Sequence, residues 1–262
     1  MSEEPRITRE LRGHVLLIGL NRVKKKNAFD LDMLHQFSDA YAALEATPEA
    51  RVGLVFAHGN DFTAGLDLAS VAPVIAEGGK GLMREGATDP WGTFGPSRKK
   101  PLICAVQGLC LTMGIELILA SDITVASSDT KFAQIEIKRG IFPFGGGTAR
   151  WVSRCGWGNA MRYLLTADEF DAKEALRIGL VQEVVEKEQV LARALQLAET
   201  VAAQAPLGVQ ATLESARTAF HSGEEAAAHD LMPTLVKLMQ TEDIQEGLAS
   251  FMERRAAVFK GK

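Results

Sequence analysis

The sequence has few of the features that mark disulfide-rich, zinc-binding or exported proteins. It contains only three cysteines in 262 residues, Cys104, Cys110 and Cys155, and no pair is spaced as CxxC. This pattern is typical of small buried thiols in a reducing compartment, and it argues against a disulfide framework or a zinc site. The first ten residues, MSEEPRITRE, are polar and acidic, unlike a signal or transit peptide. We therefore expect a cytoplasmic protein without a bound metal.

A strong positive charge and a membrane-spanning segment are also missing. The formal net charge of −4 disfavours nucleic acid as the main partner. One apolar run, 102–120, is nearly long enough to cross a bilayer, but it contains Gln107, Thr112 and Glu116 and follows Pro101. We interpret this run as a buried strand, a turn and a buried helix, and we expect no membrane partner.

The first half of the chain alternates between strand and helix signals. Short apolar runs at 14–20, 52–57, 102–106 and 123–126 predict four buried strands. After the first run, Asp30 is placed to cap a helix whose apolar residues recur at helical spacing. Strands that read as continuous apolar runs and alternate with helices predict a mostly parallel sheet covered on both faces, an α/β fold.

Two other regions have a different character. Residues 70–100 include six glycines between 78 and 95, which predicts a long loop with weak helix that forms a wall or lid of an active site. From Thr148 onward the pattern predicts successive helices, at 171–178, 186–204, 207–220, 224–239 and 243–258. We therefore expect a core domain over residues 1–200 and a C-terminal helical region over 201–262.

The segment FTAGLDL, residues 62–68, follows a strand and a turn. A small-Gly-x-Asp sequence at this point can leave the backbone N–H of Leu66 directed into a cleft. The alternative is an ordinary turn from strand to helix, in which Gly65 supplies backbone freedom and Asp67 caps the helix. Taken alone, the segment favours this alternative.

The segment QGLCLTMGIEL, residues 107–117, leaves another strand. Its glycines permit a tight turn into a helix that starts near Thr112 or Met113. The first N–H groups of a helix have no internal partner and lie at the positive end of its dipole, so they suit a developing oxyanion. Glu116 lies in the same turn among apolar residues, where a carboxylate is costly unless it is solvated, paired or used. The alternative role for Glu116 is to complement the helix dipole in a buried network.

Glu136 lies twenty residues after Glu116, with a predicted strand between them. This distance allows the chain to return and bring the two carboxyl groups together. Neighbouring carboxyls split their pKa values, so that one is protonated and one ionised, and such a pair can hold a water for an acid-base addition. The alternative is that Glu136 is a solvated loop carboxylate. The glycine-rich run 140–148 matches neither a P-loop nor GxGxxG, and we expect it to shape a pocket wall.

These segments, in this order and spacing, resemble the crotonase (enoyl-CoA hydratase/isomerase) superfamily over nearly the whole chain. NRVKKKNAF is similar to its N-terminal signature, with Val23 in place of the usual proline. FTAGLDL and AVQGLCLTMGIELILASD resemble its two oxyanion motifs, and KFAQIEIKRGIFPFGGGTAR resembles its third motif. TADEFDAKEALRIGLVQEVV and FMERRAAVFKG resemble its later helical markers. The resemblance implies a crotonase-like core of ββα spiral units and a C-terminal helical region that assembles trimers or hexamers.

The resemblance also implies roles for individual residues. The N–H groups of Leu66 and Met113 would form an oxyanion hole for a thioester carbonyl, although Met113 stands where glycine is common. Glu116 and Glu136 match the two glutamates with which the family's hydratases add water across the 2,3 double bond of an enoyl-CoA, and Ile135 replaces a frequent proline. The resemblance places Lys24, Lys25, Phe259 and Lys260 in regions that contact the CoA nucleotide in relatives. The other candidate substrate-binding residues are Ala28, Ala64, Gly65, Asp67, Trp91, Gly114 and Phe142, and the sequence leaves open whether Trp91 points into the pocket or out of it. No cofactor is expected, because coenzyme A is part of the substrate.

Other functions remain open at this stage. Within the superfamily they are double-bond isomerisation, for which relatives often keep only the later carboxylate, and hydrolysis or decarboxylation of an acyl-CoA. An RNA-binding role would use the basic cluster 24–26, but the net charge and the lack of interleaved aromatic and basic residues disfavour it. That cluster can equally be a solvated face. A catalytically silent acyl-CoA binder would not need both glutamates.

Overall fold

The computed structural model describes residues 4–262, and its framework is a six-stranded sheet in the order β1-β2-β3-β4-β6-β9. The strands are β1 (Ile7–Arg12), β2 (Val15–Leu20), β3 (Val52–Ala57), β4 (Leu102–Val106), β6 (Ile123–Ser127) and β9 (Glu183–Val185). β1 pairs antiparallel with β2, and the other neighbours are parallel. The predicted parallel sheet is thus confirmed, with two added edge strands, β1 and β9.

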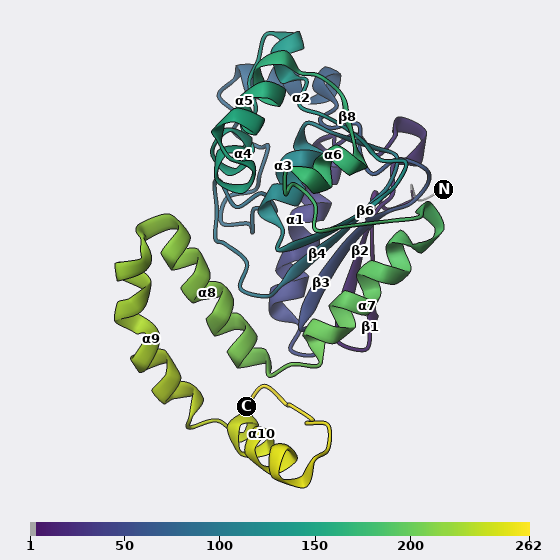
Figure 1. The fold of residues 1–262 in the computed structure, drawn as a ribbon. Helices are drawn as coiled ribbons and strands as arrows, with labels where there is room; N and C mark the ends of the chain where they lie inside the picture. Colours follow the sequence, from purple (N-terminus) through teal and green to yellow (C-terminus); the bar gives the residue numbers. More distant parts are fainter. Residues whose placement is uncertain (1–3) are drawn as a thin grey trace.

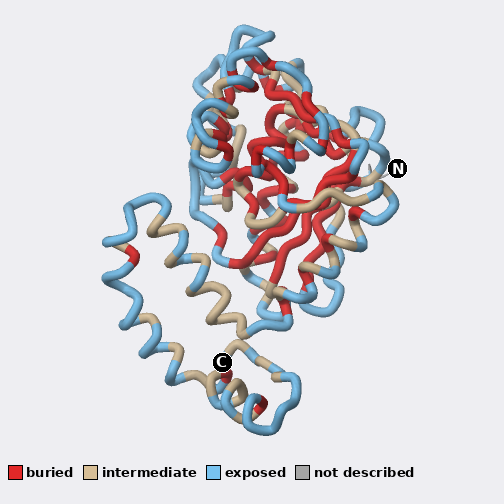
Figure 2. The backbone as a smooth tube through the Cα atoms, in the orientation of Figure 1, coloured by how far each residue is buried: buried red, intermediate tan, exposed pale blue. Residues whose placement is uncertain are grey.

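Successive residues of the central strands serve two separate cores. In β2, Leu16 and Ile18 pack into a core with helix α1 (Leu31–Ala46), whereas Val15 and Leu17 pack into a core with helix α7 (Val190–Ala202). Both faces of the sheet are therefore covered, which explains why every residue of β2 is buried. Figure 2 shows this buried centre surrounded by exposed loops and helix faces.

The apolar run 102–120 divides as predicted. It forms β4, a short strand β5 (Leu109–Leu111) and helix α3 (Met113–Ala120). No helix in the part of the chain that the structure describes is both long and apolar enough to span a membrane. The predicted cap of α1 is also present, because the Asp30 side chain accepts a hydrogen bond of 3.0 Å from the N–H of Met33.

A repeated unit places the functional segments. The chain runs through one strand of the large sheet, one strand of a second sheet and then a helix, first as β4, β5 and α3. It repeats the pattern with β6, β7 (Lys131–Ala133) and the short 3-10 helix η2 (Glu136–Arg139). The second sheet has the order β5-β7-β8, with β8 at Phe170–Asp171. Because β5 and β7 are parallel neighbours, the segments that follow them, α3 and η2, begin close together.

Nine further helices complete the part of the chain that the structure describes. They are η1 (Val23–Lys25), α2 (Leu68–Ala76), α4 (Gly147–Cys155), α5 (Trp157–Thr166), α6 (Ala172–Arg177), η3 (Lys187–Gln189), α8 (Pro206–Ser222), α9 (Glu224–Leu238) and α10 (Glu242–Glu253). In Figure 1, α8 and α9 form a hairpin that projects away from the sheet, and α10 lies near its lower end with the C-terminus. The prediction of a helix over 243–258 is wrong in its last turn. It ends at Glu253 because Arg254 has a left-handed φ of 56°.

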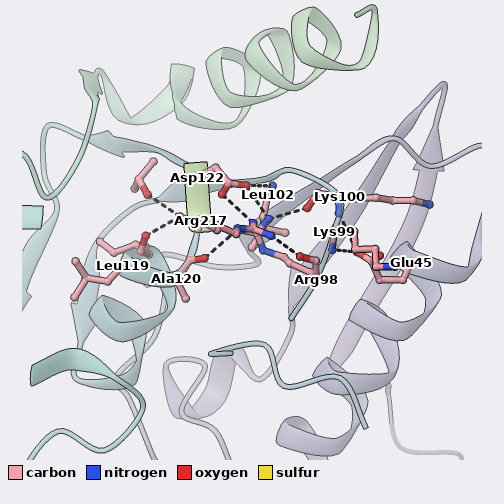
Figure 3. A network of polar contacts seen from close by, with 12 residues as sticks. Glu45, Arg98, Lys99, Lys100, Leu102, Leu119, Ala120, Asp122 and Arg217 are labelled. Carbon is pink, nitrogen blue, oxygen red and sulfur yellow. Dashed lines mark hydrogen bonds and ion pairs between the residues drawn. The ribbon is translucent and has the colours of Figure 1, made fainter. Parts of the chain in front are cut away.

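An ion-pair network joins α8 to the core (Figure 3). Asp122, just after α3, pairs with Arg98 at 2.7 Å and with Arg217 of α8 at 3.3 Å. Arg98 is only 7% exposed and also donates hydrogen bonds to the carbonyl oxygens of Lys100 and Ala120. A buried guanidinium with this many acceptors is fixed in place. The network therefore ties the end of the 70–100 loop, the end of α3 and the middle of α8 to one another.

Candidate active site

A backbone bridge brings the segment after β3 beside the strand that leads into α3. The N–H of Thr63 donates to the carbonyl of Leu109 at 2.9 Å, and the N–H of Leu111 donates to the carbonyl of Thr63 at 3.0 Å. The Thr63 hydroxyl donates in addition to the carbonyl of Asn27 at 2.7 Å. These bonds hold residues 63–66 against the start of α3.

Two backbone N–H groups meet at this junction without partners. Phe29 bonds on one side of the loop, to the carbonyl of Gly65 and to the N–H of Asp67, both at 2.8 Å, so the N–H of Leu66 is directed to the other side. Met113 is the first residue of α3, so its N–H has no acceptor within the helix. Within residues 4–262 neither N–H has a hydrogen-bond acceptor, and both residues line a cavity of about 220 Å³. The structure thus brings together the two donors that the sequence pattern predicts.

Two glycines allow this close approach. Gly65 has φ of +94°, and a Cβ there would overlap the hydroxyl of Thr112. A Cβ on Gly114 would lie 2.5 Å from the Cγ2 atom of Thr63. Any larger residue would have to separate the loop from the helix start.

Thr112 is a site residue that the sequence pattern does not single out. It has φ of 49° and ψ of −112°, a conformation that a β-branched residue rarely adopts. Its buried hydroxyl has no hydrogen-bond partner in the described chain, and the residue lines the smaller cavity. Because Thr112 directly precedes Met113, its backbone sets the direction of the Met113 N–H.

Glu136 lines the same cavity as Leu66 and Met113. It is 6% exposed, so the alternative of a solvated loop carboxylate is wrong. Its Oε1 atom accepts a hydrogen bond of 2.8 Å from the amide of Gln134, whose own oxygen accepts one of 3.0 Å from the indole of Trp151. Its Oε2 atom is buried and has no partner among the described residues. Burial is the main cause that raises the pKa of Glu136.

Gln134 and Trp151 are further site residues that the sequence analysis missed. Both are fully buried, and together they fix one oxygen of Glu136 while the other stays free. The only local signal is the position of Gln134 two residues before the glutamate. The contact with Trp151 joins residues 17 positions apart and has no signature in the sequence.

Glu116 lines neither cavity, but it lies against Gly145 and Gly147 and near enough to Glu136 for the charge of Glu136 to act on it. It is 1% exposed, and its Oε1 atom accepts a hydrogen bond of 2.9 Å from the N–H of Gly147, while Oε2 has no partner within residues 4–262. The pKa of Glu116 is raised to about 7, mainly by burial and also by the charge of Glu136, against the lowering effect of the Gly147 N–H. The two carboxyls are therefore close enough to influence each other's ionisation. Glu116 is not among the residues that line the smaller cavity.

A larger cavity of about 480 Å³ lies beside the first, under the loop of the 70–100 segment. It is lined by Leu34 of α1, by residues 78–87 and by Trp91, and it shares Leu66, Met113 and Phe144 with the smaller cavity. The prediction that the 70–100 segment forms a wall of the site is supported by this lining.

Trp91 connects that loop to the start of α3. It is 3% exposed, and its indole N–H donates to the carbonyl of Met113 at 3.0 Å. Its ring lies against Phe29 and Phe37, with centroids 5.4 and 5.8 Å away. Trp91 therefore lines the larger cavity and anchors Met113, while its contact with substrate stays a prediction.

The other predicted substrate contacts divide into two groups. Ala64 lines the smaller cavity, but Lys24, Lys25 and Phe142 are exposed and line neither cavity. Ala28 also lies outside both cavities, and its carbonyl accepts a hydrogen bond from Arg22.

Asp67 does not cap α2, so this part of the alternative reading of FTAGLDL is wrong. Its side chain makes no cap hydrogen bond and pairs with Arg22 at 2.8 Å. The pair joins two loops 45 residues apart and lies outside both cavities.

Phe259 and Lys260 lie at the opposite end of the sheet from the cavities of their own chain. The carbonyl of Phe259 accepts a hydrogen bond of 2.7 Å from Arg51, which precedes β3, whereas the site segment follows β3. The N–H of Lys260 donates to Asp243 at 2.7 Å. Contact between these residues and a CoA nucleotide therefore requires a site on a second copy of the chain, and it stays a prediction.

Comparisons with known proteins show which family and fold the chain resembles. A family model described as enoyl-CoA hydratase/isomerase matches residues 10–262. Enoyl-CoA hydratase EchA19 of Mycobacterium tuberculosis is 32% identical, covering 97% of this chain and 96% of that protein. The 2,3-dehydroadipyl-CoA hydratase of Escherichia coli K12 is 31% identical, covering 95% and 96%. A crystal structure of an enoyl-CoA hydratase from M. tuberculosis H37Rv superposes with a TM-score of 0.89 at 34% identity, covering 99% of this chain and 100% of that one. A structure from Mycobacterium abscessus, described as "a probable enoyl-CoA hydratase/isomerase", superposes with a TM-score of 0.95 at 47% identity, covering 98% and 99%.

Proposed function

The chain belongs to the enoyl-CoA hydratase/isomerase family, and from this premise we propose that it adds water across the 2,3 double bond of a 2-enoyl-CoA thioester. One observation carries the proposal. Leu66 and Met113, whose N–H groups have no partner in the described chain, line the same cavity as Glu136, and Glu116 lies near enough to Glu136 to be affected by its charge. This set matches what addition of water to an activated thioester requires, namely two donors for an oxyanion and two carboxyls for the protons.

The two N–H groups would act on the thioester carbonyl. When a hydroxyl group adds to C3, negative charge moves to the thioester oxygen and an enolate forms. Fixed donors at Leu66 and Met113 stabilise that charge more than they stabilise the neutral carbonyl, so they lower the barrier as well as aid binding. The positive end of the α3 dipole adds to the same effect.

The two carboxyls would handle the protons of one water. An ionised carboxylate accepts a proton from the water while the oxygen of the water bonds to C3. A protonated carboxyl then donates a proton to C2 of the enolate. With a pKa of about 7, Glu116 exists in both states near neutral pH, and burial raises the pKa of Glu136 as well. Each carboxyl also has a buried Oε2 atom without a protein partner in the described chain, which leaves an acceptor for water.

This chemistry needs no cofactor beyond the coenzyme A that the substrate carries. We propose that the enzyme retains its full rate after dialysis against a metal chelator. A loss of rate that added divalent metal restores would contradict this part of the proposal.

A second candidate reaction is migration of the double bond from C3 to C2. The observation that favours it is the unequal access of the two carboxyls, since Glu136 lines the cavity and Glu116 does not. A 1,3 proton shift can be carried out by one carboxylate that removes a proton from C2 and returns it at C4. Both reactions use the same oxyanion donors.

We further propose that copies of the chain assemble through the C-terminal helices. The exposed apolar residues of this part are Phe220, Leu231, Met232, Leu235, Val236, Met239, Leu248, Phe251 and Met252. Assembly would cover them and would provide the second copy that contact of Phe259 and Lys260 with substrate requires. Light scattering on the purified protein tests this, and a monomer at micromolar concentration would contradict it.

The activity test uses the purified protein with crotonyl-CoA in water enriched in ¹⁸O. Hydration predicts one ¹⁸O atom in the product, on C3, together with loss of the ultraviolet absorbance of the conjugated thioester. A 3-enoyl-CoA, offered separately, tests isomerisation, which produces a 2-enoyl-CoA without label. No turnover of any 2-enoyl-CoA would contradict the proposed function.

A further inference from the structure

We propose that the side chain of Met113 is a partition that limits the length of the acyl chain the site accepts. The proposal rests on the proposed function and concerns the same site. Three residues, Leu66, Met113 and Phe144, line both cavities. The smaller cavity is also lined by Glu136, and the larger one lies under the loop of the 70–100 segment. Residues that line both spaces lie at the boundary between them.

Met113 is the best fixed of these three residues. It is 7% exposed, whereas Leu66 and Phe144 are only partly buried. Its backbone is held by the hydrogen bond between its carbonyl and Trp91 and by its place at the start of α3. Its N–H serves as an oxyanion donor, so its side chain lies next to the acyl carbons that follow the thioester carbonyl.

The space beyond the partition suits an acyl chain. The larger cavity, of about 480 Å³, has a mostly apolar lining that includes Leu34, Leu82, Met83 and Trp91. Its volume is in the range of ordinary small-molecule pockets. A short acyl group ends before Met113, while a longer one has to displace the thioether to reach this space. Because a methionine side chain is flexible, the partition lowers the rate with long chains without abolishing it.

The experiment measures kcat/KM for 2-enoyl-CoA thioesters of four, six, eight and ten carbons. The wild-type enzyme is expected to lose at least about tenfold in kcat/KM between four and ten carbons. Met113→Ala keeps the backbone N–H and should raise the ratio of ten-carbon to four-carbon kcat/KM at least about tenfold. Met83→Ala is the matched control, because it removes the same side chain from a residue that lines only the larger cavity. It should leave the ratio within about twofold of wild type.

Three results would overturn the partition. They are a wild-type preference for ten carbons over four, an unchanged ratio in folded Met113→Ala, and an equal rise in Met83→Ala. If circular dichroism shows that Met113→Ala does not fold, Phe144→Ala removes another part of the same wall and should raise the ratio in the same direction. If the wild-type enzyme hydrates no thioester, the proposed function fails, and the partition is still tested by calorimetry with butyryl-CoA and decanoyl-CoA. The ratio of their dissociation constants should shift at least about tenfold toward decanoyl-CoA in Met113→Ala, and an unchanged ratio would overturn it.

Discussion

The N–H of Gly147 donates a hydrogen bond of 2.9 Å to Oε1 of Glu116, a carboxyl group that is only 1% exposed. Burial, together with the charge of Glu136, outweighs the lowering effect of the Gly147 and Gly145 N–H groups, so the pKa of Glu116 is raised to about 7. This carboxyl binds its proton more tightly in the folded state than in the unfolded state. It therefore lowers the free energy of unfolding at any pH at which the carboxyl is ionised in the unfolded chain. The cost is fully present above pH 7 and fades as the pH falls toward the ordinary pKa of 4.5.

Glu116→Gln should therefore stabilise the fold at alkaline pH. The pKa difference corresponds to about 3 kcal/mol at pH 8 and less than about 1 kcal/mol at pH 5. Gln retains an oxygen for the N–H of Gly147. Thermal unfolding should show a midpoint roughly 5–10 °C above wild type at pH 8 and a much smaller difference at pH 5.

Glu169→Gln is the control, because it neutralises an exposed carboxyl outside the site. It should give the same small effect at both pH values. A Glu116→Gln protein that is no more stable than wild type at pH 8 would show that the buried carboxyl carries no such cost.

The hydrogen bond between Trp91 and Met113 should matter for the rate. Trp91→Phe keeps an aromatic ring against Phe29 and Phe37 but removes the donor to the carbonyl of Met113. Met113 then loses an anchor, and its N–H is less well directed at the oxyanion. We expect kcat to fall about three- to tenfold with little change in KM, since the donor acts mainly in the transition state.

Trp157→Phe makes the same substitution at a tryptophan that is 69% exposed and outside both cavities. It should leave kcat unchanged. Equal rates for Trp91→Phe and wild type would show that the indole does not position Met113.

Gly65 should be sensitive to the smallest substitution. A Cβ in Gly65→Ala would overlap the hydroxyl of Thr112 and turn the N–H of Leu66 away from the cavity. Loss of one oxyanion donor typically costs about 10²–10³ in rate. Steady-state kinetics with the best thioester should show a fall of this size in kcat.

Gly13→Ala separates this effect from backbone strain. Gly13 also has a positive φ, of +57°, but a Cβ there would meet nothing within 4 Å. This variant should lose some stability and keep its kcat. If Gly65→Ala behaved like Gly13→Ala in kinetics, the proposed contact with Thr112 would not control the donor.

Much of the frame was predictable because it depends on local patterns. The four apolar runs became β2, β3, β4 and β6, and Asp30 caps α1 through the N–H of Met33. β1 was missed because it is a mostly exposed edge strand, and its sequence ITRELR therefore contains no apolar run. The end of α10 was missed because a left-handed Arg254 is not visible in the pattern.

The site residues were likewise only partly predictable from the sequence. Leu66, Met113 and Glu136 were predicted together, and they share a cavity because β5 and β7 are neighbours. The partners of Asp67 and Glu136 could not be predicted. Arg22 lies 45 residues from Asp67, and the link from Gln134 to Trp151 crosses from one chain segment to another. Such contacts arise from tertiary packing and carry no spacing rule.

In the proposed mechanism both carboxyls act in hydration, whereas one carboxyl is enough for isomerisation. The direct measurement compares steady-state rates of Glu116→Gln and Glu136→Gln with crotonyl-CoA and with a 3-enoyl-CoA. General acid-base groups typically contribute about 10²–10⁴ in rate. We predict that Glu136→Gln loses about 10³-fold or more in both reactions, whereas Glu116→Gln loses about 10²-fold or more in hydration and less than about tenfold in isomerisation. Equal losses in the two reactions for Glu116→Gln, or substantial hydration by Glu136→Gln, would contradict the account.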